Sequence, residues 1–335
     1  MRAPHSPEGP HRHARHGGWP RRRPLAACLA AAVASVLALA SMLQGTQAGT
    51  GHQFTVNVRG AARSYSLDVP PGATRPMPLA VAMHGWLGTG GQMARMSGLS
   101  EEAARSGVAV AYPDGNWRSW GVSPADGQED AAFIEALVRD VSSRFPVDAR
   151  RVYLIGFSNG GFMAQMVACT GRLGIAGIAV VASNLSEAAA ATCKAPAGVA
   201  FLLIHGTDDP VVPYGGGPSF RGMMLSVPAT VAFWASANRC YGPAVSSEQP
   251  SRDPDVRVFR SRLAGCAGGS EVEEWLLAGA GHDWPGGNVG FPSMIVGRRS
   301  GAVDAAPLIL RFLLRGADNS RGDPAARRRP ARERT

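Results

Sequence analysis

The sequence feature that most constrains the fold is a glycine-rich turn between a predicted strand and a predicted helix. A short apolar run with β-branched and aromatic residues occupies 151–154, and residues 162–168 have a helix-forming composition. Gly156-x-Ser158-x-Gly160 lies between them. A turn this sharp strains the backbone of its central residue, and neighbours without a Cβ let strand and helix pass close together. The pattern is typical of a nucleophile elbow, although a purely structural turn could also contain a serine.

Strand and helix patterns alternate along most of the chain, after an initial hairpin. The segments 54–58 and 64–69 alternate in polarity around a turn, as antiparallel strands do. Further strands are predicted at 79–83, 108–112, 151–156, 175–182 and 199–205, extended segments at 256–260 and 272–277, and helices at 130–145, 227–238 and 307–314. This alternation predicts an α/β fold, in which a mostly parallel sheet carries helices on both faces.

The N-terminal residues 1–48 are expected to be a secretory signal peptide. Residues 1–24 are polar and basic, 25–43 are uncharged and rich in alanine, leucine and valine, and 46–48 form a small-residue cleavage pattern. We therefore expect a secreted, extracellular protein. Alternatively, the apolar run could remain as a membrane anchor, and only in that case would a stable membrane partner be expected.

Positive charge is concentrated at the two ends of the chain. Residues 1–48 contribute +5 and residues 316–335 contribute +3 of the formal net charge of +9, which leaves +1 for residues 49–315. The folded part is therefore not basic, and no nucleic-acid partner is expected. We expect a single catalytic domain over 52–315 and a disordered basic tail over 316–335.

Four cysteines follow the predicted signal peptide: Cys169, Cys193, Cys240 and Cys266. An even number in an exported chain predicts two disulfides with three conceivable pairings, and the alternative is four buried free thiols. No spacing of cysteine and histidine suggests a metal site. The sequence also lacks a dinucleotide fingerprint and a phosphate-binding lysine motif, so no cofactor is expected.

A serine nucleophile needs a general base and an acid that orients this base. In strand-turn-helix hydrolases the chain order is serine, acid, histidine. Downstream of Ser158, the apolar strand 201–205 is followed by Asp208 and Asp209. We choose Asp209 as the acid and keep Asp208 as the alternative, while both could instead cap a turn. Only His282 follows them, so chain order selects it as the base.

The negative charge that develops during acyl transfer needs two backbone N–H donors, which form an oxyanion hole. One donor is expected to be the N–H of Asn159, directly after the serine. The other should come from the loop after strand 79–83, where His84-Gly85-Trp86 stands. We therefore predict the N–H of Trp86 as the second donor.

Three tryptophans near these motifs are candidates for substrate binding, namely Trp117, Trp120 and Trp284. The first two follow the Asp114-Gly115 pair, and the third lies two residues after the predicted base. A core or a surface position would explain each of them as well. Trp234 lies in the middle of a predicted helix and is expected in the core.

Six motifs together resemble one known family. They are His84-Gly85, Tyr112-Pro113-Asp114-Gly115, Asp148-x-x-Arg151-Val152-Tyr153, Gly156-Phe157-Ser158-Asn159-Gly160-Gly161, His205-Gly206-Thr207-Asp208-Asp209-x-Val211-Val212-Pro213-Tyr214 and Gly281-His282-x-Trp284-Pro285-Gly286. With them, residues 52–315 resemble the secreted polyhydroxybutyrate depolymerase-like and feruloyl-esterase-like α/β hydrolases. The resemblance implies the α/β-hydrolase fold.

The resemblance also implies roles for individual residues. It implies the catalytic triad that chain order selects, namely Ser158, Asp209 and His282. It suggests that Cys240 pairs with Cys266, so that Cys169 and Cys193 form the remaining pair. The chain departs from the family at Trp86, where a small residue or cysteine is common. This departure leaves the shape of the acyl-side pocket, and therefore the substrate, open.

These observations predict a secreted serine carboxylic-ester hydrolase that works through an acyl-enzyme. We expect short soluble esters or hydroxyalkanoate oligomers as substrates, with weak adsorption to solid polyester, because the Arg-rich tail offers no aromatic platform. The alternative is a feruloyl or acetyl esterase on plant polysaccharide. An acyltransferase would need an alcohol that outcompetes water, and a non-catalytic cell-surface binding protein would need a broken triad.

Overall fold

The computed structural model describes residues 51–121, 123–219 and 222–322, with side chains up to Arg315. The following description concerns the described part of the unit Ala48–Thr335. The predicted signal peptide lies outside the described residues. Within the described residues, no helix combines the length and the apolar character that a membrane crossing requires.

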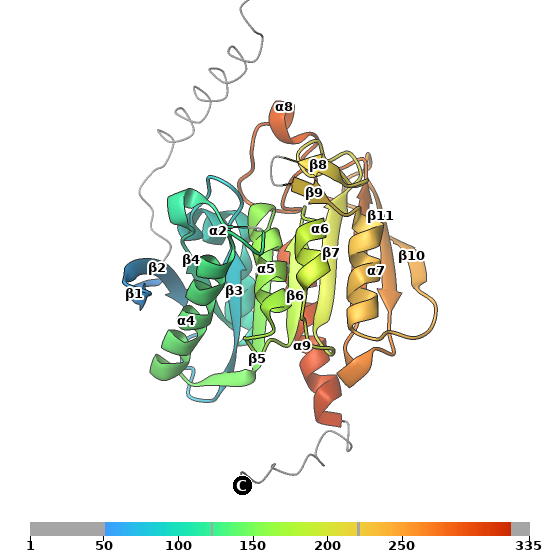
Figure 1. The fold of residues 1–335 in the computed structure, drawn as a ribbon. Coiled ribbons are helices and arrows are strands. Elements are labelled where there is room, and N and C mark those ends of the chain that lie inside the picture. Colours follow the sequence, from blue (N-terminus) through green and yellow to red (C-terminus); the bar gives the residue numbers. More distant parts are fainter. Residues whose placement is uncertain (1–50, 122, 220–221, 323–335) are drawn as a thin grey trace, which may run out of the picture. The chain divides into compact units, whose positions relative to one another are not determined.

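Ten strands of the described residues form one sheet (Figure 1). In spatial order they are β1 (His52–Val58), β2 (Ala61–Asp68), β4 (Ala109–Pro113), β3 (Met77–Met83), β5 (Val147–Phe157), β6 (Gly177–Val181), β7 (Ala200–Gly206), β12 (Val272–Ala278), β11 (Arg257–Leu263) and β10 (Val245–Gln249). The six strands from β4 to β12 run parallel, whereas the β1–β2 hairpin and the β11–β10 pair are antiparallel edges. The predicted sheet with its N-terminal hairpin is confirmed.

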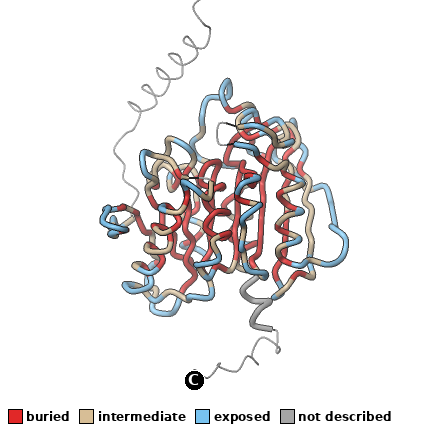
Figure 2. Tube along the Cα trace, viewed as in Figure 1, coloured by how far each residue is buried: buried red, intermediate tan, exposed pale blue. Residues whose placement is uncertain are grey.

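Helices cover both faces of this sheet. One face carries α4 (Gln128–Arg144), α5 (Asn159–Thr170), α6 (Glu187–Thr192) and α7 (Val227–Ala237), and the other carries α2 (Gly90–Ser97), α3 (Leu99–Ser106) and α9 (Ala305–Gly322). Successive side chains of a strand point to opposite faces, so each central strand contributes to two hydrophobic cores. In β3, Leu79 and Val81 belong to the core that includes side chains of α4 and α5, whereas Ala80 belongs to the core that includes side chains of α3 and α9. Figure 2 shows the buried strands between the layers.

Smaller elements lie on the connections between these layers. They are the hairpin β8 (Gly217–Ser219) and β9 (Gly222–Met224), helix α8 (Ser293–Val296), and the 3₁₀ turns η1 (Asn116–Arg118) and η2 (Ala267–Gly269). The β8–β9 hairpin and α8 lie at the same end of the sheet, at the top of Figure 1. None of these elements was expected from the sequence pattern.

Helix α9 extends into the segment 316–335, for which the sequence predicts a disordered tail. Helix α9 continues to Gly322, whereas the apolar pattern predicted its end at Leu314. Pro324 is the first residue after Pro307 that would interrupt a helix, so the backbone continues beyond the last apolar side chains. Residues 323–335 lie outside the described residues.

Candidate active site

The turn between β5 and α5 consists of Ser158 alone, since β5 ends at Phe157 and α5 begins at Asn159. Its φ of 53° and ψ of −119° are strained for a residue with a side chain. The glycines on either side permit this geometry. A Cβ on Gly156 would lie 2.2 Å from the carbonyl oxygen of Gly160, and one on Gly160 would lie 2.2 Å from a carbonyl oxygen at the end of β3.

Three side chains from separate loops meet at this turn. The hydroxyl of Ser158 lies 2.9 Å from Nε2 of His282, and Nδ1 of His282 donates to Oδ2 of Asp209 over 2.7 Å. All three residues are buried. The order along this hydrogen-bond chain is that of a nucleophile, a base and an acid that orients the base.

The acidic pair after β7 divides into a buried and an exposed residue. Asp209 is buried, and its Oδ1 accepts the backbone N–H groups of Val211 and Val212, both over 2.8 Å. Asp208 is exposed, and its carboxylate accepts from the hydroxyl of Thr207. The structure therefore brings Asp209, and not Asp208, to His282.

Backbone contacts and a ring contact hold His282 in place. Its N–H donates to the carbonyl of Val296 over 2.6 Å, and the preceding Gly281 donates to Arg298 over 2.8 Å. The ring of Phe157, which directly precedes the serine, lies 5.2 Å from the imidazole ring between centroids. The segment that ends α8 is thus hydrogen-bonded to the backbone of His282 and Gly281.

The loop after β3 lies against the turn. A Cβ on Gly85 would lie 3.5 Å from Cβ of Ser158, so this loop passes directly beside the serine. The buried His84 stabilises the loop, because its Nδ1 donates to the carbonyl of Gly85 and its Nε2 accepts the N–H of Gly115. Burial lowers the pKa of His84 to about 4, so the ring is neutral at pH 7. Trp86 follows with a half-exposed side chain.

A second buried histidine lies beside the acid. His205 ends β7 in the same His-Gly pairing, and its Nδ1 donates to the carbonyl of Gly206 over 2.9 Å. Its Nε2 lies 3.9 Å from Oδ2 of Asp209. Burial lowers the pKa of His205. The sequence showed both His-Gly pairs at strand ends, but it gave neither histidine a role.

The three candidate tryptophans lie in different environments. Trp117 is 95% exposed on the turn η1, at a φ of 50° that is unusual for a residue with a side chain. Trp120 and Trp284 are each only 1% exposed. The expectation that these two line a substrate pocket is therefore not supported, since their rings pack inside the protein. Trp234 is fully buried, which confirms its core position.

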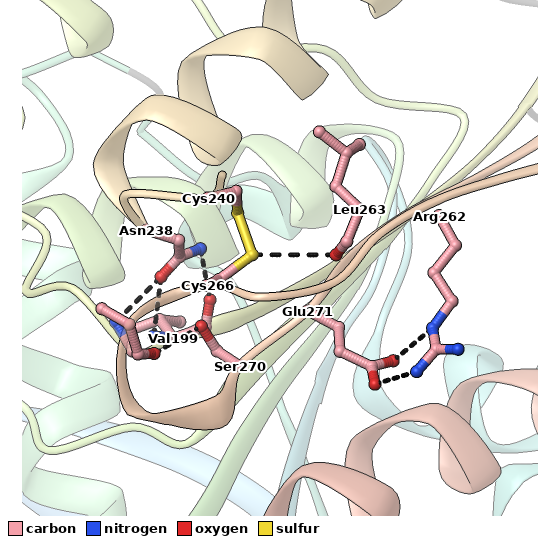
Figure 3. Close-up of a disulfide and its surroundings, with 10 residues drawn as sticks. Val199, Asn238, Cys240, Arg262, Leu263, Cys266, Ser270 and Glu271 are labelled. Carbon is pink, nitrogen blue, oxygen red and sulfur yellow. Dashed lines mark hydrogen bonds and ion pairs between the residues drawn. A yellow bond between two sulfur atoms is a disulfide. The ribbon is translucent and has the colours of Figure 1, made fainter. Parts of the chain in front are cut away.

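Two disulfides connect helix ends to neighbouring loops. Cys169 bonds to Cys193, and Cys240 bonds to Cys266, as the resemblance implied. The second bond joins the residues after α7 to the loop between β11 and β12 (Figure 3). Beside it, the buried Asn238 accepts the N–H of Val199 and donates to its carbonyl. No group of three or more histidine, cysteine, aspartate or glutamate residues suited to a metal ion occurs within the described ranges.

Comparisons with known proteins show the family of the chain. Residues 63–194 match the family model described as "Esterase PHB depolymerase". The chain is 31% identical over 283 residues to NocK of Nocardia uniformis subsp. tsuyamanensis, whose name assigns it to the esterases; the match covers 78% of this chain and 82% of NocK. The chain belongs to this esterase family. The protein is accordingly a carboxylic ester hydrolase, and the family implies a small-molecule ester substrate.

Other members and one solved structure extend the comparison. Feruloyl esterase C of Emericella nidulans is 30% identical, over 49% of this chain and 61% of the fungal protein. Feruloyl esterase B of Piromyces equi is 27% identical over 68% of this chain, which spans only 44% of that protein. An acetyl xylan esterase from Aspergillus awamori superposes with a TM-score of 0.53 over 70% of this chain and 94% of its own, at 17% identity. This last likeness concerns the fold.

Proposed function

We propose that the protein is a secreted serine esterase that works through an acyl-enzyme, with Ser158 as nucleophile, His282 as base and Asp209 as the acid that orients the base. The observation that carries this proposal is the continuous hydrogen-bond chain from the Ser158 hydroxyl through both imidazole nitrogens to a buried carboxylate. The strained turn, which presents the serine at the N-terminus of α5, supports the same assignment.

In the first half of the reaction, Oγ of Ser158 attacks the ester carbonyl carbon and its proton moves to Nε2 of His282. The tetrahedral intermediate collapses when the bond to the alkoxy oxygen breaks, and Nε2 returns the proton to this leaving alcohol. In the second half, water attacks the acyl-serine, His282 accepts a proton from it, and Oγ leaves as the hydroxyl again. Asp209 keeps the imidazole in the tautomer that carries hydrogen on Nδ1.

The oxyanion of both intermediates needs donors beside Ser158, and we assign the backbone N–H groups of Trp86 and Asn159 to this role. Asn159 is the first residue of α5, so its N–H is one of those that the helix leaves without an intrahelical partner. Trp86 follows Gly85, where an added Cβ would lie 3.5 Å from Cβ of Ser158. Loss of one such donor costs about 3–4 kcal/mol of transition-state stabilisation.

Variants at four positions test the mechanism with a p-nitrophenyl ester of a short acid. Ser158→Ala and His282→Ala should lower kcat by about 10⁴ or more, because each removes a reacting group. Asp209→Ala should also lower kcat by about 10⁴, whereas Asp208→Ala should stay within a few-fold of the unchanged protein. Turnover by Ser158→Ala near that of the unchanged protein would reject the mechanism. A large loss in Asp208→Ala alone would transfer the acid role to that residue.

We further propose short soluble esters and hydroxyalkanoate oligomers as the substrates. The family model that matches residues 63–194, which include the turn at Ser158, supports the hydroxyalkanoate oligomers. Feruloyl or acetyl esters on plant polysaccharide are the second candidate, supported by the relatives named as feruloyl esterases. Trp117 is proposed as a substrate contact, because it is an exposed aromatic side chain two residues before Ser119, whose hydroxyl bonds the side chain of Asn159.

A side-by-side substrate panel distinguishes these candidates. Hydroxybutyrate trimer, methyl ferulate and a polyester film are compared at equal enzyme concentration. Highest kcat/KM on the trimer with little clearing of the film is the expected result. Trp117→Ala should raise KM for the preferred ester several-fold, since stacking contacts of this kind contribute about 1 kcal/mol. Rapid clearing of the film without turnover of the soluble esters would reject this substrate class.

We propose that the chain is exported, because residues 1–48 contain a basic segment followed by an apolar one. The two disulfides support it, because such bonds persist in oxidising compartments. The mass of the protein recovered from culture medium gives the test. A mature chain that begins near Gly49 and contains no free thiol is expected, and a cell-retained chain of full length would contradict cleavage.

A further inference from the structure

We propose that Trp120 is a positioning residue that holds the two oxyanion-donor segments, His84-Gly85-Trp86 and Asn159, in one fixed arrangement. The inference rests on the proposed mechanism, since it concerns the donors assigned above. It gives a role to a tryptophan that the sequence suggested as a substrate contact and that the structure places in the interior.

The first connection runs from the side chain of Trp120 to the loop after β3. The indole Nε1 donates to the carbonyl oxygen of His84 over 2.9 Å. The indole ring also lies 4.9 Å from the imidazole ring of His84 between centroids. His84 lies two residues before Trp86. The bond therefore restrains the backbone that precedes the proposed donor, the N–H of Trp86.

The second connection runs from the backbone of Trp120 to the first residue of α5. The N–H of Trp120 donates to Oδ1 of Asn159 over 2.8 Å, and Nδ2 of Asn159 donates back to the carbonyl of Trp120 over 3.1 Å. The Asn159 side chain is therefore paired with one residue at both of its polar ends. The two residues are 39 positions apart in the chain, and both are almost fully buried.

These contacts join β3 and α5 through one residue. A buried hydrogen bond resists movement of the two groups that it joins. If it breaks, a donor or an acceptor is left in the interior with no water molecule to replace the lost partner. The oxyanion donors act only if they already point to the place where charge develops. Trp120 supplies the rigidity that this requires, and it does so without contact to the substrate. An effect on the transition state, and little effect on substrate binding, follows from such a role.

The chain contains a matched control for the indole bond. Trp234 is also fully buried, and its Nε1 donates to Oε1 of Gln165 over 3.0 Å. It stacks on Phe201, with ring centroids 5.0 Å apart. Trp120→Phe and Trp234→Phe therefore each delete one buried indole N–H donor and keep an aromatic ring in the core. Only the first deletion removes a hydrogen bond to the loop beside Ser158.

The test measures kcat, KM and thermal midpoint for both variants with a p-nitrophenyl ester. Trp120→Phe is expected to lower kcat about 10-fold or more, with KM within about three-fold, because the loop of one donor loses its anchor. Trp234→Phe should lower the thermal midpoint by a comparable amount and leave kcat within about two-fold. Equal kcat in the two variants would overturn the proposal.

Two further measurements keep the proposal testable if Trp120→Phe folds poorly. Asn159→Ala removes the other connection while Trp120 stays, and it should also lower kcat about 10-fold. In the double variant the loss should be smaller than the product of the single losses, because both changes act on one network. Losses that multiply would show independent effects and overturn the coupling.

A boronic acid forms a tetrahedral adduct with the serine. Its affinity for the protein would not change if Trp120 only stabilised the fold. Its affinity should fall in Trp120→Phe by the same factor as kcat/KM, and it should stay unchanged in Trp234→Phe. Unchanged affinity in both variants would contradict the proposal. The catalytic mechanism and the role of Trp120 can be rejected separately. Activity of Ser158→Ala would remove the mechanism, whereas an inactive Ser158→Ala together with a normal kcat in Trp120→Phe would remove only the role of Trp120.

Discussion

At the scale of single residues, His84 and His205 make the stability of the protein depend on pH. Burial lowers the pKa of His84 from 6.5 to about 4, and it also lowers the pKa of His205. Between these values the unfolded chain binds protons that the folded protein does not bind. The free energy of unfolding must therefore fall as pH falls from about 6.5 towards 4, and the full contribution returns above about pH 6.5.

His84→Gln tests this linkage, because a glutamine amide can hydrogen-bond but does not titrate. Urea unfolding at pH 7.5 and pH 5 should show that the unchanged protein loses on the order of 2 kcal/mol through His84 at the lower pH. The variant should lose correspondingly less over the same interval. An identical pH dependence in both proteins would show that the His84 ring is not kept neutral by burial.

Single residues also show what a sequence can and cannot predict. Chain order selected Ser158, Asp209 and His282, and the structure brings these three together. Their motifs are local, so each could be found without knowledge of the fold. The tryptophans could not be sorted in this way. Trp117 and Trp120 are three residues apart, yet one is 95% and the other 1% exposed, because the path of the loop decides burial.

At the scale of elements, the disulfide from Cys240 to Cys266 fixes the end of α7 to the loop before β12. It lies at the start of β7, since the neighbouring Asn238 bonds Val199. Asp209 follows the other end of β7. The bond is therefore a stabilising feature remote from the hydrogen-bond chain of Ser158.

Replacement of both cysteines by serine should lower stability without loss of turnover. The bonded residues are 26 positions apart, and closure of a loop of this length contributes about 3 kcal/mol. Urea unfolding of Cys240→Ser/Cys266→Ser should show this loss, while kcat at 25 °C stays within about two-fold. A large fall in kcat of the folded variant would show that this edge of the sheet influences the site.

Elements with strong apolar patterns were predicted, and those with weak patterns were missed. The buried strands β3, β4, β6 and β7 lie within about two residues of their predicted ranges. Helices α2 and α3 have only eight residues each and meet at Gly98, and neither was predicted. Strand β10 is polar and mostly exposed, and its pairing with β11 defines it rather than its own residues.

At the scale of the whole molecule, the order of the strands in the sheet could not be predicted from the sequence. Strand β4 lies between β2 and β3. Strand β12 lies beside β7 although the β8–β9 hairpin, α7, β10, β11 and η2 intervene along the chain. These pairings depend on contacts between distant segments. His282 meets Ser158 across 124 positions for the same reason, because the carboxyl ends of β5 and β12 reach the same edge of the sheet.

The assignment of Ser158 as the nucleophile is tested by reaction with a fluorophosphonate, which bonds covalently to an activated serine. We expect one adduct per molecule on the peptide that contains Ser158, with simultaneous loss of esterase activity. Ser158→Ala should form no adduct. His282→Ala should react with the fluorophosphonate more slowly than the unchanged protein, by a factor of about 10³ or more. An adduct on a different residue, or unlabelled protein that still hydrolyses p-nitrophenyl esters, would contradict the assignment of Ser158 as the nucleophile.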